Sequence, residues 1–261
     1  MRSKLGLMLV VLLSLSVAAW ADDWNKDFAV SGKPEVIVET NDANLIVHST
    51  ADGKVSARVT TRGYRISEDD VRIDARQSGN RVEIDIKIPE HHSGWGNRSV
   101  RLELDVPRAS DLNLHTRDGN VEASGVQGDL RINSGDGNLD LRDLGGSLVA
   151  STGDGNIRTE GRFELLDLHT GDGNITADAN QGSHITSDWT LRTGDGSIEL
   201  RLPSDARADL DAHTGDGKVV VDFSVETSGT LRENSIRGKI NGGGRMLELR
   251  SGDGDLRIEK M

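Results

Sequence analysis

The sequence contains no cysteine among its 261 residues, so no disulfide stabilises the fold and no lipid can be attached through an N-terminal cysteine. Aromatic residues make up only 3% of the chain, which leaves few rings on which bases or sugars could stack. Positive charge is also scarce, because 31 Lys and Arg face 43 Asp and Glu. The net charge of −12 argues against nucleic acid as a partner and favours cations and cationic surfaces.

Residues 1–21 have the pattern of a secretory signal peptide. Arg2 and Lys4 precede an apolar stretch over residues 5–19, and an Ala-Trp-Ala triplet ending at Ala21 is a cleavage site. The stretch is shorter than the about 20 residues that a membrane span needs, although a retained anchor helix is the alternative. We expect cleavage after Ala21, which leaves 240 residues with a net charge of −14 and no membrane span. The predicted location is periplasmic or extracellular, including the cell surface.

A six-residue pattern, Thr/Ser-Gly-Asp-Gly-Asn followed by an apolar residue, recurs through the second half of the chain. Its Asp residues are separated by 18, 18, 18, 23, 21 and 37 positions, and the last interval predicts a degenerate copy within Ser235 to Gly244. A glycine-poor copy is visible at Thr40 to Leu45. The Asp residues of the seven turns are Asp118, Asp136, Asp154, Asp172, Asp195, Asp216 and Asp253.

The residues that flank each turn alternate between apolar and polar, which is typical of strands with one buried face. A second break lies between consecutive Asp-Gly turns, so each repeat contains two short strands and two turns. Two all-β architectures fit: a β-solenoid with coils of about 18–23 residues, and an antiparallel β-meander whose hairpins close at Asp-Gly. The scarcity of aromatics among the buried positions favours the narrow interior of a solenoid.

Residues 22–110 are also rich in predicted strands, but they are less regular than residues 111–261. We interpret them as the irregular N-terminal part of the same solenoid, so that residues 22–261 form one continuous domain. A separate small β-domain is the alternative. The C-terminal strand around Arg257 has no obvious cap beyond it, so we also predict edge-to-edge self-assembly unless charged residues guard that edge.

The Asp-Gly turns, the Asp105-Val106-Pro107 step and the Gly-Lys-Ile-Asn-Gly-Gly-Gly ending at Gly238 to Gly244 resemble one known group. The chain is similar to the bacterial "putative adhesin" family of β-solenoid domains of unknown function. The resemblance covers nearly all of residues 22–261. It implies an extracytoplasmic β-helix with no assigned enzyme activity, and it carries no functional residues over to this sequence.

Stacked coils would align the seven Asp side chains in a column at about 4.8 Å spacing. Such a column attracts cations, and Ca²⁺ bound between coils is one hypothesis for it. The alternative is that each Asp accepts backbone hydrogen bonds within its own turn, where Gly supplies a positive φ. No other cofactor is expected.

Histidines suggest two further candidate sites. His115, His169 and His213 share the position three residues before Asp, but no two neighbouring repeats carry His there, which favours a solvated polar column over a metal site. The loop that contains His91, His92 and Trp95 is the best candidate for a specific contact, and a hairpin tip whose Trp packs on the coil is its alternative.

No sequence motif of a hydrolase, phosphate-binding loop or metalloprotease is present. We therefore predict a non-enzymatic envelope or surface scaffold that binds an envelope or surface protein or a glycan. A Ca²⁺-stabilised structural spacer is one alternative. A polysaccharide-active β-helix enzyme is the other, since its site would leave no local motif, and release of unsaturated ends from acidic polysaccharides tests it.

Overall fold

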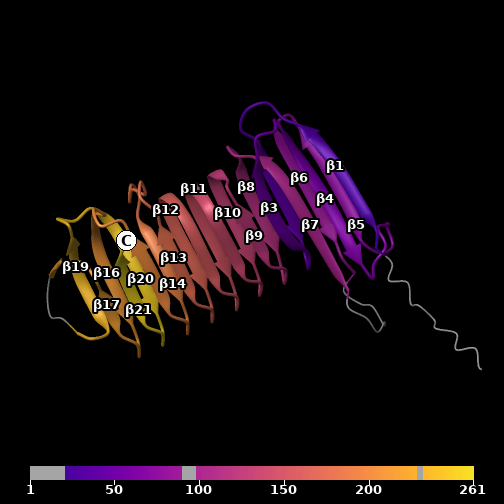
Figure 1. Ribbon diagram of the computed structural model, residues 1–261. Coiled ribbons are helices and arrows are strands. Elements are labelled where there is room, and N and C mark those ends of the chain that lie inside the picture. The colour runs from indigo at the N-terminus through magenta and orange to yellow at the C-terminus, as the bar shows by residue number, and fades with distance from the viewer. Residues whose placement is uncertain (1–20, 90–97, 228–231) are drawn as a thin grey trace, which may run out of the picture.

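The computed structural model describes residues 21–89, 98–227 and 232–261, which form strands joined by turns and loops (Figure 1). In these ranges we find no helix long and apolar enough to cross a membrane. The strands are β1 (Asp23–Ala29), β2 (Glu35–Thr40), β3 (Asn44–Thr50), β4 (Lys54–Arg62), β5 (Arg72–Ser78), β6 (Arg81–Lys87), β7 (Ser99–Pro107), β8 (Asp111–Thr116), β9 (Val121–Ser124), β10 (Gln127–Ser134), β11 (Leu139–Thr152), β12 (Ile157–Thr170), β13 (Ile175–Ala179), β14 (Trp189–Thr193), β15 (Ile198–Leu202), β16 (Ala208–Thr214), β17 (Val219–Val221), β18 (Val225–Thr227), β19 (Ser235–Ile240), β20 (Arg245–Ser251) and β21 (Leu256–Lys260).

The regular part of the chain is a β-solenoid. Strands that precede the Asp-Gly turns pair in parallel with one another, as β8, β10 and the second half of β11 do, and form what we call the pre-turn face. Strands that follow the turns, such as β9, the first half of β11 and β13, pair in parallel on the post-turn face. Parallel pairing at one-repeat intervals confirms the solenoid and excludes an antiparallel meander.

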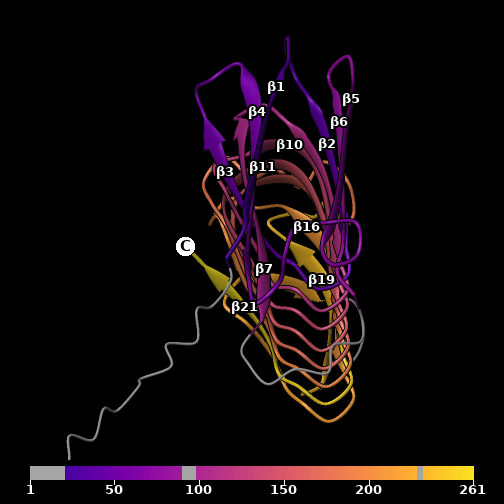
Figure 2. The same cartoon turned by 90° about the vertical axis from the view of Figure 1, so that its right-hand side faces the viewer.

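The core is the narrow space between these two faces. Figure 2 shows the coils as flattened loops with two long sides. Leu112, Leu130, Leu148 and Leu166 are register neighbours on four successive strands, and each is at most 2% exposed. The alternating sequence therefore stacks identical apolar side chains, and aliphatic residues fill most of this space. Trp189 and Phe163 are buried in it as well, so the core also accommodates single rings.

Residues 22–110 join the same sheet, but the coils do not follow chain order. The coil made of β2 and β3 lies between the β6–β7 coil and the β8–β9 coil, with parallel pairing on both sides. The antiparallel strands β1, β4 and β5 close this end. The side chain of Lys26 links β1 to β5 across this end. Its Nζ lies 5.1 Å from the centre of the Phe28 ring and donates to the carbonyl oxygen of Ala75 at 2.9 Å.

The other end is interleaved in the same way, which corrects two predictions. The coil Arg245–Lys260 lies between the β14–β15 coil and the β16–β17 coil (Figure 1). Its strand β21 is paired on both sides, so the predicted free C-terminal edge at Arg257 is wrong. Residues 235–244 are not a degenerate repeat either: β19 pairs antiparallel with β16, and a Gly-rich turn then leads into β20 on the other side of β16.

Candidate functional site

The seven Asp-Gly turns lie side by side and form what we call the turn edge. In six of the seven turns a Ser or Thr hydroxyl, rather than the Asp carboxylate, accepts a hydrogen bond from the turn backbone. In the turn that begins at Thr170, the N–H of Gly173 donates to Thr170 Oγ1 at 3.2 Å. The same hydroxyl donates to the carbonyl oxygen of Gly155 in the preceding coil at 2.8 Å. Among the described residues, no backbone N–H donates to the Asp carboxylate of any of these turns, so the expectation that Asp accepts hydrogen bonds within its own turn is wrong.

The second glycine of each turn is required by close approach between coils. A Cβ added to Gly137, Gly155 or Gly173 would lie well under 3.0 Å from the carbonyl oxygen of the corresponding glycine one coil earlier. None of the Asp-Gly turn glycines is among the described residues with a positive φ, so the expectation of a left-handed glycine is also wrong. Only a residue without a side chain lets the coils stack this closely.

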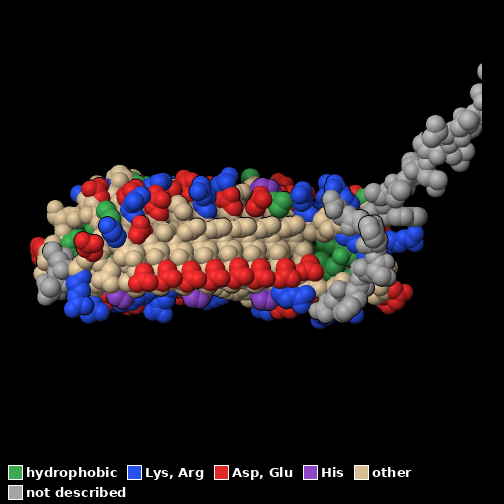
Figure 3. Space-filling model, turned by 90° about the horizontal axis from the view of Figure 1, so that it is seen from below, with side chains coloured by type: hydrophobic (Ala, Val, Ile, Leu, Met, Phe, Trp, Pro, Cys, Tyr) green, Lys and Arg blue, Asp and Glu red, His purple; other side chains and the backbone are tan. Residues whose placement is uncertain are grey.

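The Asp carboxylates are left free to face solvent. In spatial order they form the Asp row: Asp118, Asp136, Asp154, Asp172, Asp195, Asp253 and Asp216. All seven are exposed, and in Figure 3 a straight line of acidic side chains follows the edge. Asp118 contacts Arg117 at 3.4 Å, whereas the other six have no ion-pair or hydrogen-bond partner within the described ranges. Neighbouring carboxylates about 4.8 Å apart repel by roughly 0.9 kcal/mol per pair in water without salt.

The row does not form a closed metal site by itself. Over residues 21–89, 98–227 and 232–261, no three His, Asp or Glu side chains are arranged to hold a metal ion. Ca²⁺ binding stays a prediction, and comparison of thermal melting in millimolar Ca²⁺ and in chelator tests it.

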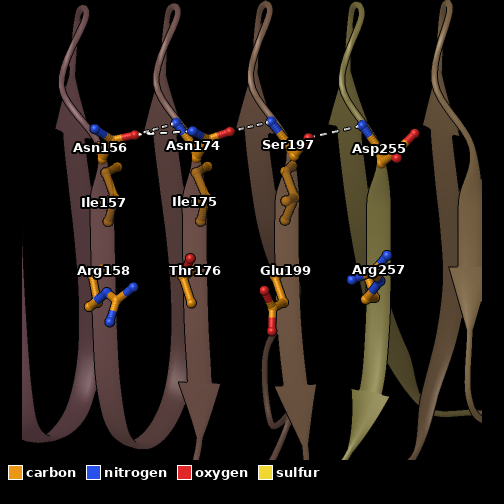
Figure 4. A pocket seen from close by; sticks show the side chains of 11 residues that line it. Asn156, Ile157, Arg158, Asn174, Ile175, Thr176, Ser197, Glu199, Asp255 and Arg257 are labelled. Carbon is orange, nitrogen blue, oxygen red and sulfur yellow. Dashed lines mark hydrogen bonds between the residues drawn. The ribbon is translucent and has the colours of Figure 1, made fainter.

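A ladder of asparagines runs beside the Asp row, and the sequence reasoning missed it. Asn156 Oδ1 accepts from the backbone N–H of Asn174 at 2.9 Å and from its side-chain amide at 3.3 Å, and Asn174 Oδ1 accepts from the N–H of Ser197 at 2.8 Å (Figure 4). Below the ladder, Arg158 and Glu199 help to line an open groove of about 510 Å³. The signal was the Asn that follows Asp-Gly in most turns, whose side chain links one coil to the next.

The three histidines lie on the pre-turn face, next to the turn edge. The register places Asn133 and Ser151 between His115 and His169, and Arg192 and Arg250 between His169 and His213. No two of them are neighbours in the stack, so the structure does not bring them together.

Two of the predicted features lie outside the described residues. The loop with His91, His92 and Trp95 falls within residues 90–97, and the signal peptide falls almost entirely within residues 1–20. Both stay predictions.

Comparison with known proteins gives a family and a set of distant structures. The model of the family described as Toastrack DUF4097 matches residues 30–259. A "putative cell adhesion protein" from Clostridium sporogenes is 15% identical over 93% of this chain and 100% of its own, with a TM-score of 0.45. A "putative adhesin" from Bacteroides fragilis is 12% identical over 92% and 97%, with a TM-score of 0.47. A "putative lipid binding protein" from Parabacteroides distasonis is 14% identical over 92% and 97%, with a TM-score of 0.43. No curated protein matches the chain.

Proposed function

Since the chain belongs to the Toastrack DUF4097 family, we propose that it is an exported, non-enzymatic scaffold of the cell envelope or surface. Its partner is a cationic surface on an envelope protein or glycan, and the Asp row binds it. The solenoid supplies a straight, rigid array of evenly spaced groups, and repeat proteins commonly bind through such extended surfaces.

The observation that carries this proposal is the number of unpaired carboxylates in the Asp row. Carboxylates elsewhere on the surface are frequently paired with arginine, as Asp140 is with Arg142. Six members of the row lack any such partner within the described ranges, although each faces a like charge on the next coil. An approaching row of cationic groups would relieve this repulsion and would gain attraction at every step, which favours a cationic partner over a neutral one.

Binding to a poly-lysine surface tests the proposal. The triple variant Asp154→Asn, Asp172→Asn, Asp195→Asn removes three consecutive charges from the middle of the row. We expect its affinity at low ionic strength to fall by about tenfold or more, and we expect salt to weaken the wild type more steeply than the variant.

A matched control removes the same charge from other places. Glu122, Asp167 and Asp205 are exposed, and none of them has a hydrogen-bond or ion-pair partner in the parts of the chain that the structure describes. The triple variant Glu122→Gln, Asp167→Asn, Asp205→Asn should lose much less affinity than the row variant. Equal losses in the two triples would mean that only net charge attracts the surface, and the Asp row would then not be the binding site.

A further inference from the structure

The last coil of the chain, Arg245–Lys260, lies inside the stack and is held by segments that are distant in sequence. We call it the C-terminal coil, and we call the space that it fills the slot. Strand β20 pairs with β14 and β16, and β21 pairs with β15 and β17. Within the coil itself, only the turn between Ser251 and Leu256 connects the two strands. We infer that the slot also accepts the C-terminal coil of a second copy of this chain, so that two copies exchange coils and form a dimer.

The slot recognises the coil by shape and by hydrogen bonds at the turn edge. Leu247, Leu249 and Ile258 are fully buried between the flanking coils. Ser251 Oγ donates to the carbonyl oxygen of Gly196 on one side at 2.8 Å. On the other side, Thr214 Oγ1 donates to the carbonyl oxygen of Gly254 at 2.7 Å.

Charged groups on both faces add to this recognition. On the pre-turn face, Glu248 of the coil accepts from Arg192 at 2.8 Å, and Arg250 of the coil lies 3.0 Å from Asp211. On the post-turn face, Glu259 of the coil lies 3.5 Å from Arg201. Every one of these contacts joins the coil to residues 178–214, so the same contacts form whether the coil comes from the same chain or from another.

The walls of the slot are formed by segments other than the C-terminal coil, so they can hold a coil from either copy. Residues 203–207 connect β15 to β16. These two strands belong to coils that are not neighbours, and the space for one coil remains between the β14–β15 coil and the β16–β17 coil. The outer side of β16 is held by β19. In contrast, the interleaved β2–β3 coil is followed directly by β4, which pairs with β1 and β7 at the closed end, so that coil cannot leave without unravelling the end.

A single connection ties the C-terminal coil to the preceding chain, and it has the features of a hinge. Asn241, Gly242 and Gly243 have φ values of 49°, 84° and 84°, a left-handed run that reverses the chain across the start of β16. A positive φ is uncommon outside glycine, and an extended hinge would release Asn241 from it. Extension would also break the hydrogen bonds that the Asn241 amide donates to the carbonyl oxygens of Ser204 and Ala206, so opening of the hinge requires partial unfolding. Short strained hinge loops favour domain swapping, and a reciprocal exchange closes as a twofold dimer.

Disulfide trapping tests the exchange cleanly, because the chain has no cysteine of its own. Glu199 of β15 and Arg257 of β21 are register partners across one wall of the slot. One copy carries Glu199→Cys, a second and differently tagged copy carries Arg257→Cys, and the two are unfolded in urea, refolded together and oxidised. We expect a reducible heterodimer whose fraction rises with protein concentration.

The control mixture replaces Glu199→Cys by Glu122→Cys, which lies on the same face but far from the slot. If the heterodimer is no more abundant than in this control, and both copies have regained the wild-type circular dichroism, the exchange does not occur. Should either copy fail to refold, Thr190→Cys with Glu248→Cys gives the same test on the pre-turn face, since these residues are also register partners. The result is independent of the Asp row and its partner.

Discussion

Replacement of a turn glycine by alanine tests the close stacking at the turn edge. In Gly155→Ala, the new Cβ would lie 2.9 Å from Thr152 Oγ1 and 2.6 Å from the carbonyl carbon of Gly137, and it would be closer still to the carbonyl oxygen. The coil cannot move away, because the carbonyl of Gly155 accepts a hydrogen bond from Thr170 on its other side. Overpacking of this kind costs about 1–3 kcal/mol, and loss of the Thr152–Gly137 hydrogen bond costs about 1 kcal/mol more.

We therefore expect Gly155→Ala to lower the free energy of unfolding by about 3 kcal/mol, or roughly 6–12 °C in Tm for a chain of this length. Thermal melting followed by circular dichroism measures this. Gly53→Ala is the matched control, because a Cβ there meets nothing within 4 Å, and its effect should stay within about 0.5 kcal/mol. If the two variants melt at the same temperature, the glycines are not required by coil contact.

Three further substitutions should change stability in other ways: two should stabilise the fold, and the effect of the third should depend on pH. The hydroxyl of Thr159 is buried with no hydrogen-bond partner in the described residues, so Thr159→Val should raise the free energy of unfolding in urea by about 1 kcal/mol. A lower free energy of unfolding in the variant would mean that the hydroxyl does have a hydrogen-bond partner. Asp172→Asn removes repulsion with both neighbours in the Asp row, so it should stabilise by up to about 1.8 kcal/mol at low salt and by less in 1 M NaCl. An equal gain at both salt concentrations would mean that electrostatic repulsion is not the cause. Burial raises the pKa of Asp211, but hydrogen bonds from Arg250 and Arg237 outweigh it and hold that pKa below the usual 3.8. Its contribution is therefore present above pH 3.8 and lost as pH falls through the lowered pKa, so Asp211→Asn should destabilise at pH 7 and the difference from wild type should shrink as pH falls below 3.8.

The sequence predicts the solenoid because the fold of each coil is determined by a short local pattern. A turn that recurs with alternating flanks fixes where each coil bends and which side chains point inward, and the copy at Thr40 indeed forms a coil whose Asn44 joins the asparagine ladder. The same pattern explains the acidic edge, because the Asp of each turn falls at the same place on every coil.

The order of the coils could not be read in this way. Each turn motif indicates one coil, but the motif is nearly the same in every coil and therefore does not indicate which coils are neighbours. The interval of 37 between Asp216 and Asp253 therefore predicts one more repeat, whereas in the structure β19 and its Gly-rich turn carry the chain around β16. Similarly, the sequence shows that glycine is required in the turns, but only the distance between stacked backbones shows why.

The interleaved order is the central claim, and the cysteine-free chain allows a direct measurement of it. Asp253 lies between Asp195 and Asp216, which puts about 4.8 Å between Asp195 and Asp253 and about 9.6 Å between Asp195 and Asp216. A disulfide spans Cα atoms up to about 7 Å apart. Under oxidation at low protein concentration, the double variant Asp195→Cys, Asp253→Cys should form an intramolecular disulfide, and Asp195→Cys, Asp216→Cys should not. The reverse result would show a stack in chain order and contradict the interleaving.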